Sequence, residues 1–389
     1  MPLKVLITNF DYKNTLAAVR ALGENGLSVV TSGPDPKRRA ASFSKYCDGW
    51  RVYSRPGVDM GSFISDIKKI LQESSYDLIL PIGVDTTIPI SYHKKELSAL
   101  TEVPVADYEI LERAHDKYKT IEAARNVDVP VPDTYLLRDG DSKFPKRYPV
   151  VVKARKGASG SGTRYASSRE ELDKVLLEFE SRKSNDIFDY REPMIQEYIP
   201  GEIRDVCVLF NHGDPKAAVV QRRVITYPPS GGIGIVNETI EEPYLVELTF
   251  RLLKEINWHG VAQVEYKYDG EGAPRLMEVN PKFWGTLELS IAAGVNFPFM
   301  LYKITMDGDV EPCFAYKRNI QMWWCSAHYP QIILAFLKNR NRVVSALTDS
   351  NKKIVDLSLR DMKPHVIQFF QGITRLVNFK SMLIHPLSR

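Results

Sequence analysis

Two glutamates in the second half of the chain have the spacing of a metal site. Glu265 and Glu278 lie on two strand-like segments separated by the turn-rich residues 268–272, which predicts a β-hairpin. Because side chains alternate along a strand, Gln263 shares a face with Glu265, and Asn280 shares one with Glu278. We expect two carboxylates and an amide to meet there as a hard oxygen site for Mg²⁺ bridging phosphate oxygens.

The alternative for this hairpin is a pair of solvent-facing glutamates on an edge strand. Apolar residues flank Glu278 on both sides, and Asn280-Pro281 follows it. A carboxylate in such a setting usually has a partner. Lys282 comes next, and a cation beside metal ligands would neutralise charge that develops during phosphoryl transfer.

A lysine and a loop of small residues suit a polyphosphate. Lys153 ends an apolar run, and residues 157–162 read Gly-Ala-Ser-Gly-Ser-Gly. The ammonium is a point charge for phosphate oxygens, and bare backbone N–H groups can approach them closely. No Gly-Lys-Ser/Thr follows, so the loop is not a Walker A motif. A simple glycine-rich hairpin turn is the alternative.

Residues 196–202, Gln-Glu-Tyr-Ile-Pro-Gly-Glu, predict a strand that ends in a hinge. Exposed backbone groups at such a hinge suit recognition of an adenine edge. The carboxylate of Glu202 suits two ribose hydroxyls. Taken alone, the segment indicates only a strand and a turn.

The elements that position these residues fall into three regions. Residues 1–110 alternate strand and helix signals, which predicts a small parallel α/β sheet. Residues 111–310 predict an α+β region, beginning with a helix over 110–126. Residues 311–389 predict a mainly helical segment. Further strands are expected at 4–8, 27–31, 77–81, 149–154, 194–198, 206–211, 217–222, 261–268 and 275–279, and further helices at 62–72, 168–179 and 243–256.

The first region lacks a dinucleotide fingerprint, because its first turn reads Asn-Phe-Asp-Tyr-Lys-Asn rather than GxGxxG. Asp85 follows an apolar strand and opens a helix. Open α/β sheets bind ligands at the carboxyl ends of their strands, so Asp85 is a candidate substrate contact. A helix N-cap is an equally good interpretation.

Composition indicates a globular chain. It has 389 residues, 44% apolar and 26% charged. The absence of a long apolar run predicts no transmembrane helix, and the first residues do not resemble a signal peptide. The four cysteines lack CxxC spacing, which favours reduced thiols. We therefore expect a cytoplasmic protein, with peripheral membrane contact as an alternative through its C-terminus.

The positive charge is concentrated in the C-terminal segment. Residues 331–389 contain ten Lys or Arg and three Asp, a net charge of +7, whereas the whole chain carries +4. Val366, Phe369, Phe370, Ile373 and Val377 have helical spacing. We favour a helix whose apolar side packs on the body of the protein. Binding to a membrane surface or an anionic polymer is the alternative; Trp323 and Trp324 are expected in the core.

Taken together, the ordered motifs resemble the ATP-grasp superfamily, especially the ATP-binding domains of carbamoyl phosphate synthetase large chains, biotin carboxylases and related carboxylate–amine ligases. The resemblance covers about residues 1–310. It implies a Rossmann-like pre-ATP-grasp domain over 1–110 and a two-lobed ATP-grasp domain over 111–310. The glycine-rich lobe is then about 130–200 and the metal-binding lobe about 201–310.

The resemblance also implies roles by position, with ATP and Mg²⁺, or Mn²⁺ in its place, as cofactors. Lys117 and Lys153 resemble the two lysines that hold nucleotide phosphates, and the 157–162 loop resembles the lid. Arg223 lies in the stretch, ending near Ile233, that borders phosphates and acceptor. The implied nucleotide contacts are Gly157, Ser159, Gly160, Ser161, Gly162, Gln196, Glu197, Tyr198, Ile199 and Glu202. The implied metal ligands are Glu265, Glu278 and Asn280, and the implied catalytic residues are Lys282 and Arg223.

One departure is Lys282, where many relatives carry arginine; lysine keeps the charge but loses the bidentate fork. The expected activity joins a small carboxylate to an amine through an acyl phosphate. A kinase or carboxylase on the same scaffold, or a nucleotide-binding regulator without turnover, are the alternatives. A homodimer is compatible with the resemblance, and no nucleic-acid partner is expected.

Overall fold

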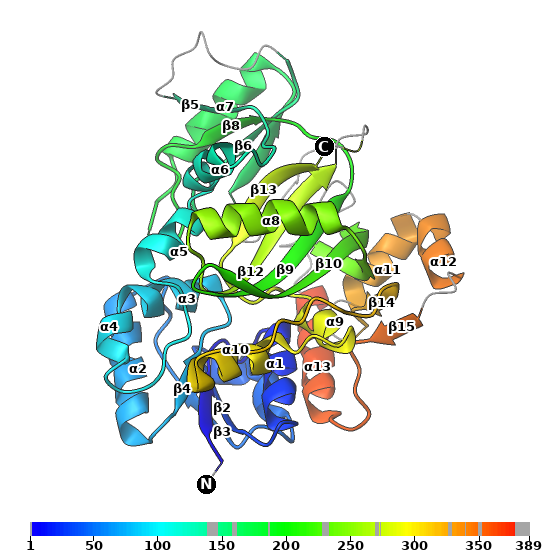
Figure 1. Ribbon diagram of the computed structural model, residues 1–389. Helices are drawn as coiled ribbons and strands as arrows, with labels where there is room; N and C mark the ends of the chain where they lie inside the picture. Colours follow the sequence, from blue (N-terminus) through cyan, green and yellow to red (C-terminus); the bar gives the residue numbers. More distant parts are fainter. Residues whose placement is uncertain are drawn as a thin grey trace.

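The computed structural model describes residues 2–137, 147–157, 162–185, 187–227, 233–268, 272, 274–325, 329–338, 340–348 and 352–377. Within this part of the chain, three β-sheets form the framework, and helices cover them (Figure 1). The mixed α/β architecture with several sheets agrees with the predicted fold class. All four cysteines are free thiols, as expected.

The first sheet is parallel and has the strand order β3-β2-β1-β4. Its strands are β1 (Lys4–Ile7), β2 (Ser28–Gly33), β3 (Gly49–Val52) and β4 (Leu78–Leu80). The helices of this region are α1 (Lys13–Gly23), α2 (Met60–Glu73), α3 (Val84–Tyr92) and α4 (Lys94–Leu97), with short 3₁₀ turns η1 (Pro36–Arg38) and η2 (Ala40–Phe43). Val5, Leu6 and Ile7 are fully buried, because helices cover both faces of a parallel sheet.

The second sheet is small and antiparallel, with the strand order β5-β8-β6-β7. Its strands are β5 (Thr134–Leu136), β6 (Val150–Lys153), β7 (Thr163–Ala166) and β8 (Met194–Glu197), and α7 (Arg169–Glu180) packs against it. Ser168 caps α7 by accepting a hydrogen bond from the Glu171 N–H.

The single helix predicted over 110–126 is wrong. The chain forms α5 (Tyr108–His115) and α6 (Lys117–Asn126), and Asp116 separates them with an extended backbone. The Asp116 carboxylate accepts hydrogen bonds from the N–H groups of Tyr118 and Lys119. An aspartate favours such an N-cap over a helix interior, which explains the break.

The third sheet has seven strands in the order β13-β12-β9-β10-β11-β14-β15. Its strands are β9 (Ile203–Asn211), β10 (Asp214–Tyr227), β11 (Ile233–Ile240), β12 (Gly260–Tyr268), β13 (Pro274–Asn280), β14 (Ile320–Trp323) and β15 (Lys352–Val355). On one face, α8 (Pro243–Glu255) buries Leu245, Leu248 and Leu252 against it. The helices α9 (Leu287–Ala292) and α10 (Phe297–Asp307) contact the N-terminal region through one shared core.

The C-terminal segment is less helical than expected. Its helices are α11 (Tyr329–Lys338), α12 (Arg340–Thr348) and α13 (Lys363–Val377), but β14 and β15 extend the large sheet. Each strand has only four residues, too few to show a clear periodicity. Trp323 and Trp324 are buried, as predicted. No described helix combines the length and apolarity needed to cross a membrane.

Candidate nucleotide and metal site

A cleft is lined by residues of the small sheet and of the β12–β13 hairpin of the large sheet. The helix α6 contributes Lys117, and β6 contributes Lys153. The remaining lining residues are Val151, Ala154, Gly157, Gly162, Thr163, Tyr165, Gln196, Glu197, Tyr198, Ile199, Ile203, Glu265, Lys267, Met277 and Glu278. Most of the residues implied to contact the nucleotide therefore share one cleft.

The carboxylate pair is set by the register of the β12–β13 hairpin. Glu265 pairs with Glu278, and Gln263 pairs with Asn280, in an antiparallel ladder. The Asn280 amide donates hydrogen bonds to both glutamates, at 3.0 Å to Glu265 Oε1 and 3.4 Å to Glu278 Oε1. The predicted hairpin is confirmed, and it brings the two acids and the amide together.

Each glutamate of the pair also has its own cation. Lys117 Nζ lies 3.3 Å from Glu278 Oε2, and Arg223 Nη2 lies 2.7 Å from Glu265 Oε2. The Arg223 guanidinium also contacts Asp205, which is almost fully buried, at 3.0 Å. Two neighbouring buried carboxylates repel each other, and these cations offset that repulsion.

The two glutamates differ in their ionisation. Burial raises the pKa of Glu265, with Arg223 acting in the opposite direction. Burial alone would raise the pKa of Glu278 as well. The nearby Lys117 and Lys153 lower this pKa by more than burial raises it, so the pKa of Glu278 lies below the ordinary value. Burial lowers the pKa of Lys153 to about 8, against the attraction of Glu278. The site thus holds a strongly ionised acid beside two cations.

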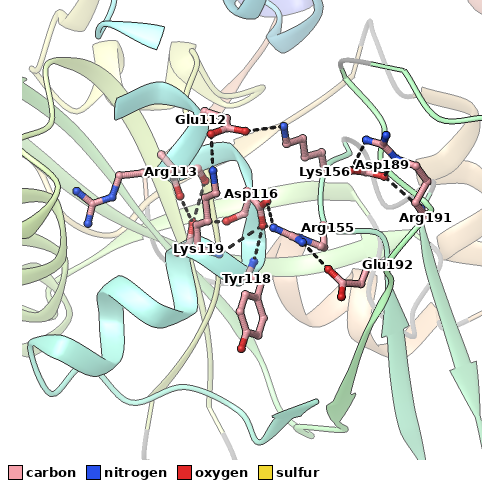
Figure 2. A network of polar contacts seen from close by, with 12 residues as sticks. Glu112, Arg113, Asp116, Tyr118, Lys119, Arg155, Lys156, Asp189, Arg191 and Glu192 are labelled. Atoms are coloured by element: carbon pink, nitrogen blue, oxygen red, sulfur yellow. Dashed lines mark hydrogen bonds and ion pairs between the residues drawn. The ribbon is translucent and has the colours of Figure 1, made fainter. Parts of the chain in front are cut away.

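Figure 2 shows the polar network that positions Lys117. Asp116 accepts from Arg155 at 2.5 Å, and Arg155 also pairs with Glu192 at 2.7 Å. The Lys117 N–H donates to the Arg155 carbonyl at 2.9 Å. Lys156 adds a further link from the same segment to Glu112 on α5, at 2.9 Å. The network joins the start of α6 to the end of β6, and so fixes Lys117 relative to Lys153.

Residues 196–199 of the predicted hinge segment also line the cleft. Gln196 is buried and donates to Thr134 Oγ1 at 2.9 Å, while its Oε1 has no hydrogen-bond partner among the described residues. A buried acceptor of this kind suits a ligand amino group. Glu197 instead accepts from the Asp133 N–H at 3.1 Å. Glu202 does not line the cleft, and its carboxylate pairs with Arg204.

The 157–162 loop, which the resemblance predicts to be a lid, is described only at its two ends. Gly157 and Gly162 line the cleft, whereas Ser159, Gly160 and Ser161 lie outside the described residues. At Gly162 an added Cβ would lie 2.7 Å from the Ala154 side chain, so the position requires glycine. Residues 228–232, in the stretch between Arg223 and Ile233, also lie outside the described residues.

Lys282 lies outside the nucleotide cleft but next to its carboxylates. Burial lowers its pKa, while Glu265, Glu278 and Asp85 favour its charged form. Asp85 is not the N-cap of α3, since Gly83 occupies that position. Asn9 follows β1, and its side-chain amide donates a hydrogen bond to Asp85 Oδ1 at 3.2 Å. Asp85 and Asn9 thus lie where strand order reverses in the parallel sheet, between β1 and β4, a usual ligand site.

Comparison with known proteins places this geometry in a family. Residues 189–327 match a family model described as "ATP-grasp in the biosynthetic pathway with Ter operon". The chain is 26% identical over 255 residues to a D-aspartate ligase of Enterococcus faecium, covering 58% of this chain and 59% of that protein. It is 26% identical over 248 residues to a carbamoyl-phosphate synthase of Methanobrevibacter smithii, covering 59% and 64%. The chain belongs to the ATP-grasp superfamily.

The same fold occurs in a biotin carboxylase–βγ-ATP complex from Campylobacter jejuni. That structure superposes with a TM-score of 0.68 at 18% sequence identity, over 82% of this chain and 74% of the other. This ATP-grasp chain spans 59% and 64% of the lengths of the two curated relatives. The predicted resemblance to the superfamily is therefore confirmed.

The residues present in this ATP-grasp chain fit a divalent cation. Glu265 and Glu278 face each other across one ladder position, and the Asn280 amide bridges them. Hard oxygen donors of this kind suit Mg²⁺ or Mn²⁺. In this structure cationic side chains balance the same carboxylates.

Sequence reasoning missed two polar residues of the site. Lys267 lines the cleft, and burial lowers its pKa. It follows Glu265 by two positions on β12, so strand alternation would have indicated it. Asp205 holds Arg223 and pairs with Glu265 across strands β9 and β12. Only the pairing of these distant strands reveals Asp205.

Proposed function

We propose that this ATP-grasp chain is an ATP- and magnesium-dependent carboxylate–amine ligase. It would form an amide or peptide bond through an acyl phosphate and release ADP and phosphate. The observation that carries the proposal is the meeting of Glu265, Glu278 and Asn280 with Lys117 and Lys153 in one cleft. The relatives' names, D-aspartate ligase and carbamoyl-phosphate synthase, support it.

In this proposal the cleft holds ATP along its length. The buried side-chain Oε1 of Gln196 would accept from the adenine amino group, and Lys117 and Lys153 would contact phosphate oxygens. Glu265, Glu278 and Asn280 would hold Mg²⁺, which supplies charge neutralisation for the phosphates. Lys117 and Arg223, which contact these carboxylates, would be the cations beside the anionic groups of the ligand.

The chemistry would proceed in two steps. A carboxylate oxygen of the acid forms a bond to the γ-phosphorus of ATP while the bond to the β-phosphate oxygen breaks, leaving ADP. The amine then attacks the acyl carbon, the carbon–oxygen bond to phosphate breaks, and the amine loses a proton. Lys282, whose charged form Glu265, Glu278 and Asp85 favour, would offset the negative charge of the first step.

The test is product analysis with the full chain. Purified protein is incubated with Mg·ATP and pools of carboxylic acids and amino acids, and ADP, phosphate and new amides are followed by mass spectrometry. We expect magnesium-dependent ADP release with specific pools, together with an amide. ADP with a phosphorylated or carboxylated product would replace the ligase by a kinase or carboxylase. ATP binding without ADP release from any pool would instead favour a regulatory role.

A further inference from the structure

The C-terminal segment exposes apolar side chains that a folded body would normally bury. Leu359 is 89% exposed, Leu337 73% and Phe370 60%. Met362, Val366 and Phe369 are also exposed, and α11 packs near α13. These six residues define what we call the C-terminal surface. The expectation that the apolar side of this helix packs inward is wrong for Val366, Phe369 and Phe370.

The described exposed charged side chains of the C-terminal segment itself, residues 331–377, all carry positive charge. Lys338, Arg340, Arg360 and Lys363 are exposed. Residues 331–389 contain no glutamate, and the described aspartates, Asp356 and Asp361, are buried at 3% and 4% exposure. The surface is therefore both apolar and basic.

Buried contacts fix the outward orientation of α13. Arg20 on α1 contacts Asp361 Oδ2 at 2.9 Å and His365 Nε2 at 2.8 Å. Ser44 donates to Asp361 at 2.7 Å, and the Lys45 N–H donates to it at 2.9 Å. His365 and Asp361 therefore face the N-terminal region, as Figure 1 shows for α13 beside α1. Val366 and Phe370 project from the helix about 100° and 140° away from His365, and both are exposed.

We propose that the C-terminal surface binds the interface of an anionic lipid membrane. Exposed leucine and phenylalanine side chains enter the boundary between headgroups and acyl chains, and basic residues beside them attract anionic lipids. This chemistry is complementary to both properties of the surface, its exposed apolar side chains and its exposed basic residues.

Two other occupants fit the C-terminal surface less well. In a symmetric dimer the same surface meets its copy, so Arg360 and Lys363 would approach like charges. A nucleic acid would satisfy the basic residues through its phosphates, but it would offer little to Leu359 or Phe370.

The test is vesicle flotation with the full-length chain. Phosphatidylcholine vesicles are compared with vesicles that also contain phosphatidylserine, at low and high salt. We expect binding to the anionic vesicles that weakens with salt, because exposed charges are screened. A Leu359→Ser/Phe370→Ser variant should bind about tenfold more weakly, since two inserted apolar side chains are lost. Arg360→Glu/Lys363→Glu should lose the preference for phosphatidylserine.

A matched control changes apolar residues of similar exposure elsewhere. Val58 is 83% exposed and Leu177 65%, so Val58→Ser/Leu177→Ser should bind vesicles as the parent does. Nucleotide binding by every variant, measured by calorimetry, checks that the fold is intact. The absence of flotation, or equal binding by the Leu359→Ser/Phe370→Ser variant, would overturn the proposal. Binding to a duplex RNA oligonucleotide without binding to vesicles would also overturn the membrane proposal. A dimer that the Leu359→Ser/Phe370→Ser variant dissociates would overturn it as well.

Discussion

The candidate nucleotide cleft and the C-terminal surface both contain several cationic side chains, but the surroundings of these cations differ. In the cleft, Lys117 and Arg223 are largely buried, and each lies against a glutamate. On the C-terminal surface, Arg360 and Lys363 are exposed beside exposed apolar residues, and the nearby Asp361 is turned inward. Lys117 and Arg223 are thus paired with carboxylates, whereas Arg360 and Lys363 lie exposed to solvent.

The difference follows from where each set of charges lies. A buried cation without a counter-ion is costly, so the cleft must supply carboxylates from neighbouring strands. An exposed cation is solvated by water and needs no partner. Changes in the cleft should therefore alter chemistry and stability strongly, and changes on the surface should leave both almost intact.

The largest expected effect concerns the charges of the cleft. Glu278→Gln and Lys153→Ala should each lower magnesium-dependent ADP formation by at least about 100-fold, the loss typical of a removed charge-stabilising group. The measurement is ADP release with an active substrate pool. Glu241→Gln, an exposed residue paired with Arg318, is the control. Full activity of purified Glu278→Gln would contradict its assignment as a metal ligand.

The network that positions Lys117 should dominate stability. Asp116→Ala removes an N-cap and leaves Arg155 without its buried partner, which we expect to lower the free energy of unfolding by about 3 kcal/mol. Asp116→Asn retains a capping oxygen and should cost less. Urea unfolding of both variants measures the two contributions. Equal losses would show that the ion pair contributes nothing beyond the cap.

The pH dependence of stability should also originate near the cleft. Burial lowers the pKa of His115 to about 4, whereas an unfolded histidine has a pKa of about 6.5. Between these values the unfolded chain binds a proton that the folded chain does not. Stability should therefore fall as the pH decreases through this range, by at most about 1.4 kcal/mol per pH unit from this residue.

His115→Gln should flatten that slope, measured as the free energy of unfolding at several pH values between 4 and 7. Comparison of both proteins at pH 8 separates the lost packing of the imidazole from its ionisation. An unchanged slope in the variant would assign the acid sensitivity to other groups.

The smallest effect is expected on the C-terminal surface. Leu359→Ser and Phe370→Ser should each change the free energy of unfolding by less than about 0.5 kcal/mol, because both side chains already contact solvent. Urea unfolding provides the measurement, and Leu252→Ala on the buried side of α8 provides the contrast. A large loss for Phe370→Ser would mean that this side chain is covered in solution.

The sequence predicted the parts of the fold that depend on local pattern. The β12–β13 hairpin with Glu265 and Glu278 followed from alternation and a turn signal, and the first strands followed from short apolar runs. The break at Asp116 was missed because helical periodicity continues across it, although aspartate is a good N-cap. Four-residue strands such as β14 carry too little pattern to be separated from their helical neighbours.

By itself the sequence determined which residue types could do chemistry and their order along the chain, because hairpins, caps and glycine turns depend on near neighbours. Only the tertiary structure decided which charges meet. Asp205 contacts Arg223 because their strands lie in one sheet, and Arg155 contacts Asp116 from a different element. Arg20 contacts Asp361, which lies 341 positions away in the sequence. The same contacts decided that α13 exposes its phenylalanines, since helical spacing shows that a face is apolar but not whether that face lies against the protein.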